Sequence, residues 1–356
     1  MNKNITEEIF SEFSICDFDS VSVYESLDSL NLLILQIILE KYFSVKLDNG
    51  LMKDFKTIND ALQYCQKNSN IIYNRFEKKE IFKCSEVEVG MPEMSNMSLS
   101  ENWLLKYLGD THWKLITKGF EDNKDLILQG CGIERVYPAF IRINYHTSVI
   151  SSFKECDKLV FETDINTFEN KAFVSNVKAS SEDKFINASL ISLFACRKNE
   201  SSNELELYDL EIYEHNINEL ISIPVIFNEY RLAKKMLLNE VRTPYGVFVV
   251  SDDHIFTTVY DINPYIDING VGLLYFASYP IISDFLLLKY DKNLIYYDTV
   301  YRDIFYFSNI NLDDKIIFKL HYIENIEEKV VIFTSLIRVS DNKLMSQILT
   351  IKTKNC

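Results

Sequence analysis

The chain has 356 residues, of which 47% are hydrophobic and 25% charged, and it contains 9 glycines and 6 prolines. This length predicts two or three domains with packed cores, and the few glycines and prolines argue against long disordered segments. Lysine and arginine total 37 against 52 acidic residues, which gives a formal net charge of -15. Because nucleic-acid binding requires a basic surface, the charge argues against a nucleic-acid partner.

The cysteines and the apolar runs indicate the cellular compartment of the protein. The 7 cysteines are scattered and never spaced Cys-x-x-Cys, which indicates reduced thiols and neither a disulfide framework nor a metal site. The first residues lack the apolar stretch of a signal peptide. Residues 30–39 form the longest apolar run, and Asn31 and Gln36 interrupt it. Because a membrane helix needs about 20 apolar residues, we expect a cytoplasmic protein without a membrane segment.

Hydrophobic periodicity divides the chain into a helical part and a β-rich part. Residues 1–68 show helical patterns, with helices expected to begin near Thr6, Asp28 and Lys56. A tract rich in Lys, Asn and Glu within residues 69–81 is the expected linker. From there on, strand-like alternation dominates, and helical periodicity returns at about 99–118 and 270–289.

The β-rich part contains the same order of predicted elements twice. Each unit has a short strand, one long helix and several long strands, and we place the units at residues 82–225 and 226–356. A curved antiparallel sheet wrapped around one helix is a hot-dog fold, and two such units can fuse their sheets side by side, which hides two edge strands. The predicted fold class is therefore α+β: a small all-helical domain followed by a double hot-dog.

Ser29 stands at the expected start of a helix. It follows Asp28, precedes Leu30, and opens a helix with a continuous apolar face. An Asp-Ser-Leu triplet in this setting resembles acyl carrier proteins, in which this serine carries 4'-phosphopantetheine. The resemblance covers residues 1–68 and implies that Ser29 is the attachment site. The free N–H groups of a helix start would favour the phosphodiester. The alternative is that Asp28 and Ser29 only cap the helix.

Two loops precede the two long helices of the β-rich part. In the second loop, Asp267-x-Asn269-Gly270 comes before an apolar run and resembles the loop that starts the central helix of hot-dog thioesterases. There the helix start polarises a thioester carbonyl. In the first loop, Asn102 is the corresponding amide. The alternative is structural, because Asn-Gly is a common turn and Asp267 could act as a cap.

Five segments occur in an order that identifies a family. They are GMP (90–92), LSENWLLKYLGDTHW (99–113), RVYPAFIRI (135–143), NPYIDINGVGLLYFASYP (263–280) and RDIFYFSN (302–309). This order resembles the leinamycin-type bifunctional acyltransferase/decarboxylases of polyketide pathways, which are double hot-dogs. The resemblance extends over residues 85–356. One departure is that residues 92–101 lack the glycines expected before the first helix.

The resemblance implies an activity and its site residues. Such enzymes take methylmalonyl-CoA, release carbon dioxide, and pass the propionyl group to a carrier protein; the sequence does not decide between malonyl and methylmalonyl. A tyrosine is the proposed acyl acceptor, and Tyr137 is the best match. Asn269 and Gly270 are the expected oxyanion donors, and Asn102 and Asp267 the expected substrate-binding residues. The resemblance therefore implies a coenzyme A thioester as the substrate, 4'-phosphopantetheine attached to Ser29, and no metal ion.

The same resemblance suggests partners. These are acyl-CoA, acyl carrier domains in cis or in trans, polyketide synthase proteins, and a second copy of the chain in a homodimer. Because the usual pKa of tyrosine is about 10, Tyr137 would need help as a nucleophile, and Arg135 on the same strand face is a candidate.

Other functions stay open at this point. A hot-dog dehydratase could use His112 with Asp267, although the position of His112 inside the first helix suits a structural hydrogen bond better. A thioesterase acting on carrier-bound chains is a further alternative. A non-catalytic docking module attached to a carrier is the third.

Overall fold

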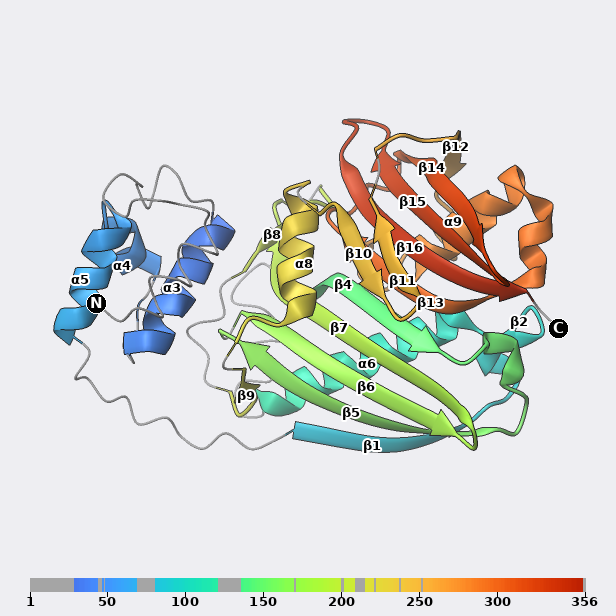
Figure 1. Cartoon of the computed structure of the whole chain (residues 1–356), viewed down its shortest axis with the longest axis horizontal. Helices are drawn as coiled ribbons and strands as arrows, with labels where there is room; N and C mark the ends of the chain where they lie inside the picture. The colour runs from blue at the N-terminus through green and yellow to red at the C-terminus, as the bar shows by residue number, and fades with distance from the viewer. Residues whose placement is uncertain are drawn as a thin grey trace. The chain divides into compact units, whose positions relative to one another are not determined.

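The computed structural model describes residues 29–43, 47, 49–68, 81–120, 136–169, 171–199, 202–208, 215–220, 222–236, 238–250 and 252–354. The chain divides into two compact units, Met1–Glu77 and Lys78–Cys356 (Figure 1). The division falls inside the predicted linker, and each unit is described by itself. Among the described residues, no helix is long and apolar enough to cross a membrane.

The first unit contains three described helices, α3 (Ser29–Phe43), α4 (Asn49–Asp54) and α5 (Ile58–Asn68). Helix α3 begins at Ser29, as predicted, and Ile34, Leu35 and Ile38 are buried on it. Helix α5 begins after a reciprocal cap, in which Thr57 N donates to Asp60 Oδ2 and Asp60 N donates to Thr57 Oγ1. The predicted helix near Thr6 lies outside the described residues.

The second unit is built on one large sheet of 12 strands, in which every pair is antiparallel except β5 with the short strand β9. The main path through it is β1-β5-β6-β7-β4-β13-β16-β15-β14-β12. The first half comprises β1 (Ile81–Glu88), β4 (Tyr137–Thr147), β5 (Lys158–Phe168), β6 (Ala172–Ser181) and β7 (Lys184–Arg197). The second half comprises β12 (Phe256–Asp261), β13 (Tyr297–Tyr306), β14 (Lys315–Ile326), β15 (Lys329–Arg338) and β16 (Leu344–Lys354). The order of the two halves is the same, read outward from the β4–β13 pair.

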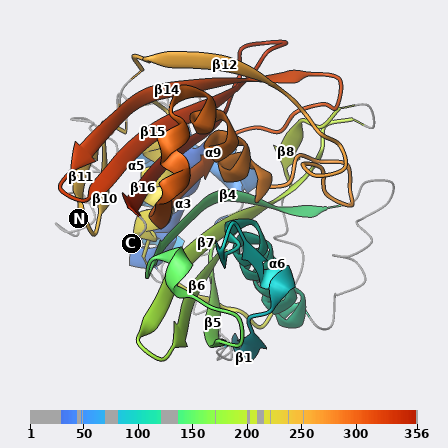
Figure 2. The ribbon, with the colours of Figure 1, turned by 90° about the vertical axis from the view of Figure 1, so that its right-hand side faces the viewer.

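One long helix lies against the concave face of each half. Helix α6 (Glu101–Gly119) follows β1, and helix α9 (Ser278–Tyr290) follows β12 (Figure 2). Ser100 caps α6 by accepting a hydrogen bond from Trp103 N at 3.3 Å. Strands β4 and β13 pair with each other, for example Ile143 with Ile304, and fuse the halves into one sheet. This is the hot-dog arrangement that the periodicity predicts, present twice.

Shorter elements complete the second unit. Helix α8 (Val225–Lys234) contacts β4 and β7, and strands β10 (Glu240–Thr243) and β11 (Gly246–Val249) form a separate hairpin. The small elements are η1 (Met91–Glu93), β2 (Met94–Ser95), β3 (Ser98–Leu99), η3 (Ile150–Ser152), β8 (Leu205–Leu207), β9 (Asn218–Glu219) and η4 (Lys292–Tyr296).

The structure bears on two sequence-based predictions. The predicted boundary at 225/226 lies between the first two residues of α8, and the division of the sequence there stays a prediction. Most important for function, the second long helix begins at Ser278 and not at residue 270. Residues 262–277 form a loop instead, with a single bridge between Ile268 and Leu274.

A buried ion cluster joins the two long helices to the sheet. The Arg302 side chain is fully buried and donates to Glu101 Oε1 and Oε2 at 2.8 and 2.7 Å, and to Asp284 Oδ1 and Oδ2 at 3.0 and 2.9 Å. Lys352 Nζ contacts Asp284 Oδ2 at 2.7 Å. Burial would raise the pKa of Asp284, but Arg302 and Lys352 lower it well below its usual range.

Loss of one carboxylate from this cluster is expected to destabilise the unit strongly. Glu101→Ala leaves part of the Arg302 charge unpaired in the core, and we expect a loss of about 3 kcal/mol in the free energy of unfolding. Urea unfolding followed by circular dichroism measures this. The control is Glu86→Ala, the same change at an exposed ion pair with Lys158, where less than about 1 kcal/mol is expected. Equal losses of unfolding free energy in the two variants would contradict the role of Glu101 as a partner of the buried Arg302 charge.

Candidate active site

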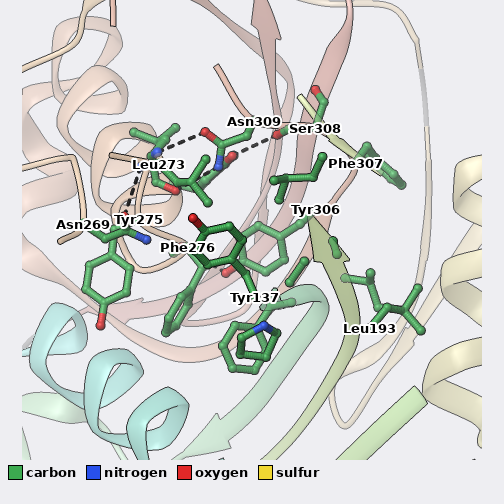
Figure 3. A pocket seen from close by; sticks show the side chains of 18 of the residues that line it. Tyr137, Leu193, Asn269, Leu273, Tyr275, Phe276, Tyr306, Phe307, Ser308 and Asn309 are labelled. Carbon is green, nitrogen blue, oxygen red and sulfur yellow. Dashed lines mark hydrogen bonds between the residues drawn. The ribbon is translucent and has the colours of Figure 1, made fainter. Parts of the chain in front are cut away.

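A cavity of about 410 Å³ lies in the second unit. Its lining comes from the middle of α6, the first half of β4, the loop before α9, the first turn of α9, the end of β13, and from β8 and α8. Aromatic side chains contribute much of this lining (Figure 3). The loop and helix start therefore meet a strand of the other half at one enclosed space, as ligand sites commonly do.

Asn269 presents an amide to this cavity in a fixed orientation. Its Oδ1 accepts hydrogen bonds from Val271 N at 3.1 Å and Leu273 N at 3.0 Å. Because a backbone N–H can donate to the oxygen of a side-chain amide but not to its NH₂ group, these two bonds decide which end of the amide is the NH₂ group. Nδ2 is left as the Asn269 atom that can donate to a ligand.

Side chains from distant parts of the chain hold the Asn269 loop in place. Asn309 Nδ2 donates to Leu274 O at 3.1 Å, and its Oδ1 accepts from Leu274 N at 3.0 Å. Asn203 Nδ2 donates to Gly272 O at 2.8 Å, and an Arg197 N–H donates to Val271 O at 2.6 Å. The amide of Asn269 is thus preorganised before any ligand arrives.

Tyr137 is the first residue of β4, is half-buried, and lines the same cavity as Asn269. It pairs with Ala195 of β7. Two other tyrosines, Tyr279 and Tyr306, form part of the cavity wall and are fixed by hydrogen bonds. Tyr279 Oη donates to Ser308 O at 2.9 Å, and Tyr306 Oη donates to Phe276 O at 3.1 Å. Burial raises the pKa of both these phenols. They hold the loop before α9 against the end of β13.

Three other predicted site residues of this unit do not line the cavity with Tyr137 and Asn269. Gly270 is absent from the cavity lining and has no heavy atom within 4 Å of the place where a Cβ would stand. Asp267 is buried and accepts hydrogen bonds from Tyr260 Oη and Asn263 N, both at 2.8 Å, so it shapes the loop. Asn102 lies in the first turn of α6, outside the lining, with Oδ1 buried and lacking a hydrogen-bond partner within the described part of the chain. Ser29 belongs to the first unit.

The late start of α9 explains why Gly270 differs from its predicted role. The two bonds that Asn269 Oδ1 accepts favour a turn, and the helix begins only after Tyr275 and Phe276. Gly270 therefore cannot offer a helix-terminal N–H group. The first turn of α9 still lines the cavity through Tyr279, so a helix N-terminus is present there, although from residues other than the predicted ones.

His112 is a structural residue. It is fully buried, and its Nδ1 and Nε2 lie 2.7 and 2.8 Å from the hydroxyls of Ser175 and Ser192. Burial lowers its pKa to about 3. A dehydratase pair with Asp267 is not formed, because both side chains are committed to other partners. Arg135, the expected helper of Tyr137, lies outside the described residues.

The buried neutral state of His112 predicts a pH dependence of stability. Its folded pKa of about 3 is below the ordinary 6.5, so the unfolded chain binds the additional proton between these values. Stability should fall as pH decreases from 6.5, by up to about 1.4 kcal/mol per pH unit from this group. Urea unfolding between pH 4 and 7.5 measures the slope, and His112→Gln should reduce it. An equal dependence of stability on pH in the native protein and in His112→Gln would contradict the buried neutral state of His112.

Three contributors to the site have no recognisable signal in the sequence. Asn309 positions the loop from the end of β13, and Gly109 and Phe276 meet in the cavity wall. RDIFYFSN, LSENWLLKYLGDTHW and NPYIDINGVGLLYFASYP each contain one of them, but no segment indicates that its residue faces a cavity. Among the described residues there is no group of three side chains that could hold a metal ion.

Comparison with known proteins shows the fold. No family model and no curated protein sequence matches the chain. A solved putative oleoyl thioesterase from Lactobacillus plantarum is 12% identical over 77% of this chain and 95% of that one, with a TM-score of 0.51. The 12:0-ACP thioesterase from Umbellularia californica is 9% identical over 79% of this chain and all (100%) of that one, also with a TM-score of 0.51. The chain thus contains the hot-dog fold of these thioesterases, which confirms this part of the predicted fold class.

Proposed function

We propose that the second unit decarboxylates a malonyl-type thioester of coenzyme A, methylmalonyl-CoA or malonyl-CoA, and transfers the remaining short acyl group to an acyl carrier protein. The observation that carries the proposal is the preorganised Asn269 amide, whose Nδ2 is available in a cavity that Tyr137 also lines. This reaction requires a donor to an oxyanion and an enclosed site, and it requires no base.

The first step would break the bond between the carboxylate and the α-carbon. Carbon dioxide leaves, and the electron pair moves into the thioester to give an enolate, whose charge lies largely on oxygen. One well-placed donor to such an oxygen lowers the barrier by about 3–4 kcal/mol, and Asn269 Nδ2 is the donor we assign. The aromatic walls solvate the departing carboxylate poorly, which favours its conversion to a neutral gas.

The second step would transfer the acyl group. After water protonates the α-carbon, the Tyr137 oxygen can attack the acyl carbonyl, and the phenol proton passes to the departing coenzyme A thiolate. The carrier thiol then attacks the tyrosine ester and gives its proton to the departing tyrosine oxygen. In the other route Tyr137 donates a hydrogen bond to the thioester oxygen and the carrier thiol attacks directly. Both routes give the same acyl-carrier product and differ in whether an ester forms on Tyr137.

The first unit supplies the proposed acceptor. A helix that begins at Ser29, with Asp28 before it in the sequence, supports 4'-phosphopantetheine on that serine. A tethered acceptor has an effective concentration in the millimolar range for a short flexible linker, so loading within one chain or between two chains of a homodimer is feasible. Polyketide synthase proteins would use the loaded propionyl or acetyl group, which places the reaction in the cytoplasm.

Thioester hydrolysis is the second candidate. The fold is shared with thioesterases, and the Asp110 carboxylate on α6 lines the cavity, where it could activate water. Asp110 is, however, paired with Lys114 at 2.6 Å. Hydrolysis would give a free acid, a dehydratase would give an enoyl thioester, and a docking module would give no product.

Intact mass spectrometry tests the proposal. Full-length protein carrying phosphopantetheine is incubated with methylmalonyl-CoA, and we expect it to gain the mass of a propionyl group. Ser29→Ala, which cannot carry the arm, should still release carbon dioxide and form propionyl-CoA, with no propionyl group at position 29. A propionyl group in Ser29→Ala on a residue other than Tyr137 would show that transfer ends elsewhere. Free methylmalonate from both proteins would favour hydrolysis.

A further inference from the structure

Two aromatic rings meet a helical glycine in the cavity wall. Phe140 of β4 and Phe276 of the loop before α9 have ring centroids 4.5 Å apart, and both line the cavity. Gly109 of α6 lines it as well. Three elements from the two halves of the sheet therefore meet at this one place.

The glycine is required by this contact. A Cβ on Gly109 would lie 2.3 Å from Phe276 Cζ and 3.3 Å from Phe140 Cε2. Glycine inside a helix costs about 1 kcal/mol relative to alanine. Because Gly109 has no Cβ, the Phe276 ring can pack against the backbone of α6.

The rings lie next to the proposed reaction centre. Phe276 and Asn269 belong to the same loop, and Phe276 directly precedes Ala277, the N-cap of α9. Figure 3 shows Asn269, Tyr275 and Phe276 on one side of the cavity and Leu193 and Phe307 on the other. A thioester carbonyl held by Asn269 would have these rings beside it.

The α8 side of the cavity offers an ammonium group to the other end of the substrate, and Glu204 and Glu206 also belong to the lining. Lys234 of α8 lines the cavity, and Tyr230 of the same helix stacks on Phe307 at 5.8 Å. A phosphate of the pantetheine arm fits the ammonium group better than the aromatic wall. With the arm on the α8 side, the acyl group points toward Phe140 and Phe276.

We propose that Phe140 and Phe276, seated against Gly109, limit the acyl group to short chains and exclude longer ones from this end of the cavity. The inference rests on the proposed function, whose substrate it narrows. Phe276 and Phe140 are then specificity-determining residues, and Gly109 positions Phe276 by leaving room for its ring.

Binding of coenzyme A thioethers tests chain length without turnover. S-propyl-, S-hexyl- and S-decyl-CoA cannot be hydrolysed or decarboxylated, and isothermal titration calorimetry measures their affinities for the full chain. The native protein should prefer the propyl compound. Phe276→Ala should raise the affinity for the hexyl compound about 10-fold or more relative to the propyl compound, because each newly buried methylene contributes about 0.8 kcal/mol. Phe285→Ala, at a ring that is 55% exposed on α9, is the matched control and should keep the native preference.

A double variant tests the role of the glycine. Gly109→Ala alone should lower both the melting temperature and the affinity for S-propyl-CoA, because the new methyl group collides with the Phe276 ring. In the Phe276→Ala background the same change should raise the melting temperature, since the collision is gone and alanine favours the helix. An effect of Gly109→Ala that is the same in both backgrounds would contradict the contact.

The outcomes separate this inference from the proposed function. An unchanged ratio of hexyl to propyl affinity in Phe276→Ala, in a protein that still releases carbon dioxide from methylmalonyl-CoA, would overturn the inference alone. A shifted ratio without decarboxylation would support the inference and contradict the proposed reaction. Failure of every thioether to bind would contradict both.

Discussion

Asn269→Asp is expected to lower kcat for decarboxylation of methylmalonyl-CoA by about 100- to 1000-fold, with a small effect on the melting temperature. An aspartate can still accept the hydrogen bonds from Val271 N and Leu273 N, so the loop keeps its geometry. It lacks the Nδ2 donor, and its negative charge would repel the enolate oxygen. Release of carbon dioxide under substrate saturation measures the effect.

A second variant separates the donor from the loop. Asn269→Ala removes the donor and also the two loop bonds, so it should lower both kcat and the melting temperature. If Asn269→Asp retained native activity while Asn269→Ala lost it, the loop bonds would be the function of Asn269. The assignment of Nδ2 as the oxyanion donor would then be wrong.

Tyr137→Phe is expected to reduce acyl transfer to Ser29 by about 100-fold or more, because the phenol is removed while the ring and the cavity shape stay. If an ester forms on Tyr137, carbon dioxide release should persist in the variant, and propionyl-CoA should accumulate in place of the acyl-carrier. If Tyr137 donates a hydrogen bond to the enolate, carbon dioxide release should fall together with transfer. Parallel assays of gas release and of the mass at Ser29 measure both quantities.

The control for this variant is a tyrosine in the same loop as Asn269 that is 97% exposed, Tyr265. Tyr265→Phe should keep native gas release and native transfer. A Tyr137→Phe protein that matches Tyr265→Phe in both assays would remove Tyr137 from the mechanism.

The apolar patterns predict the strands of the second unit well, because some strands bury one face and others, such as β13 and β15, bury nearly every residue. Strand β1 has its first residue, Ile81, buried and then alternates between half-buried and exposed positions, and the helix expected at 99–118 is α6 at residues 101–119. A resemblance to known families singles out Tyr137 and the Asn269 loop, and the roles of both stay predictions. The cavity that both residues line connects positions 132 residues apart, and only the paired halves bring them together.

What the sequence could not predict depends on contacts between distant residues. The Glu101–Arg302 ion pair joins residues 201 apart, and nothing local marks either partner. The start of α9 was placed at residue 270 because the apolar run begins there, whereas the bonds to Asn269 Oδ1 and the anchoring by Asn309 delay the helix until Ser278. In the sequence Gly109 is a single glycine within a predicted helix, and the reason for it becomes visible only with Phe276 beside it.

Release of labelled carbon dioxide tests the central claim most directly. Methylmalonyl-CoA labelled with ¹³C in the free carboxyl group is given to the phosphopantetheine-bearing full chain, and headspace gas and protein mass are followed together. We expect labelled gas in amounts equal to the unlabelled propionyl group gained by the protein. Labelled methylmalonate in solution, or label retained on the protein, would contradict the account.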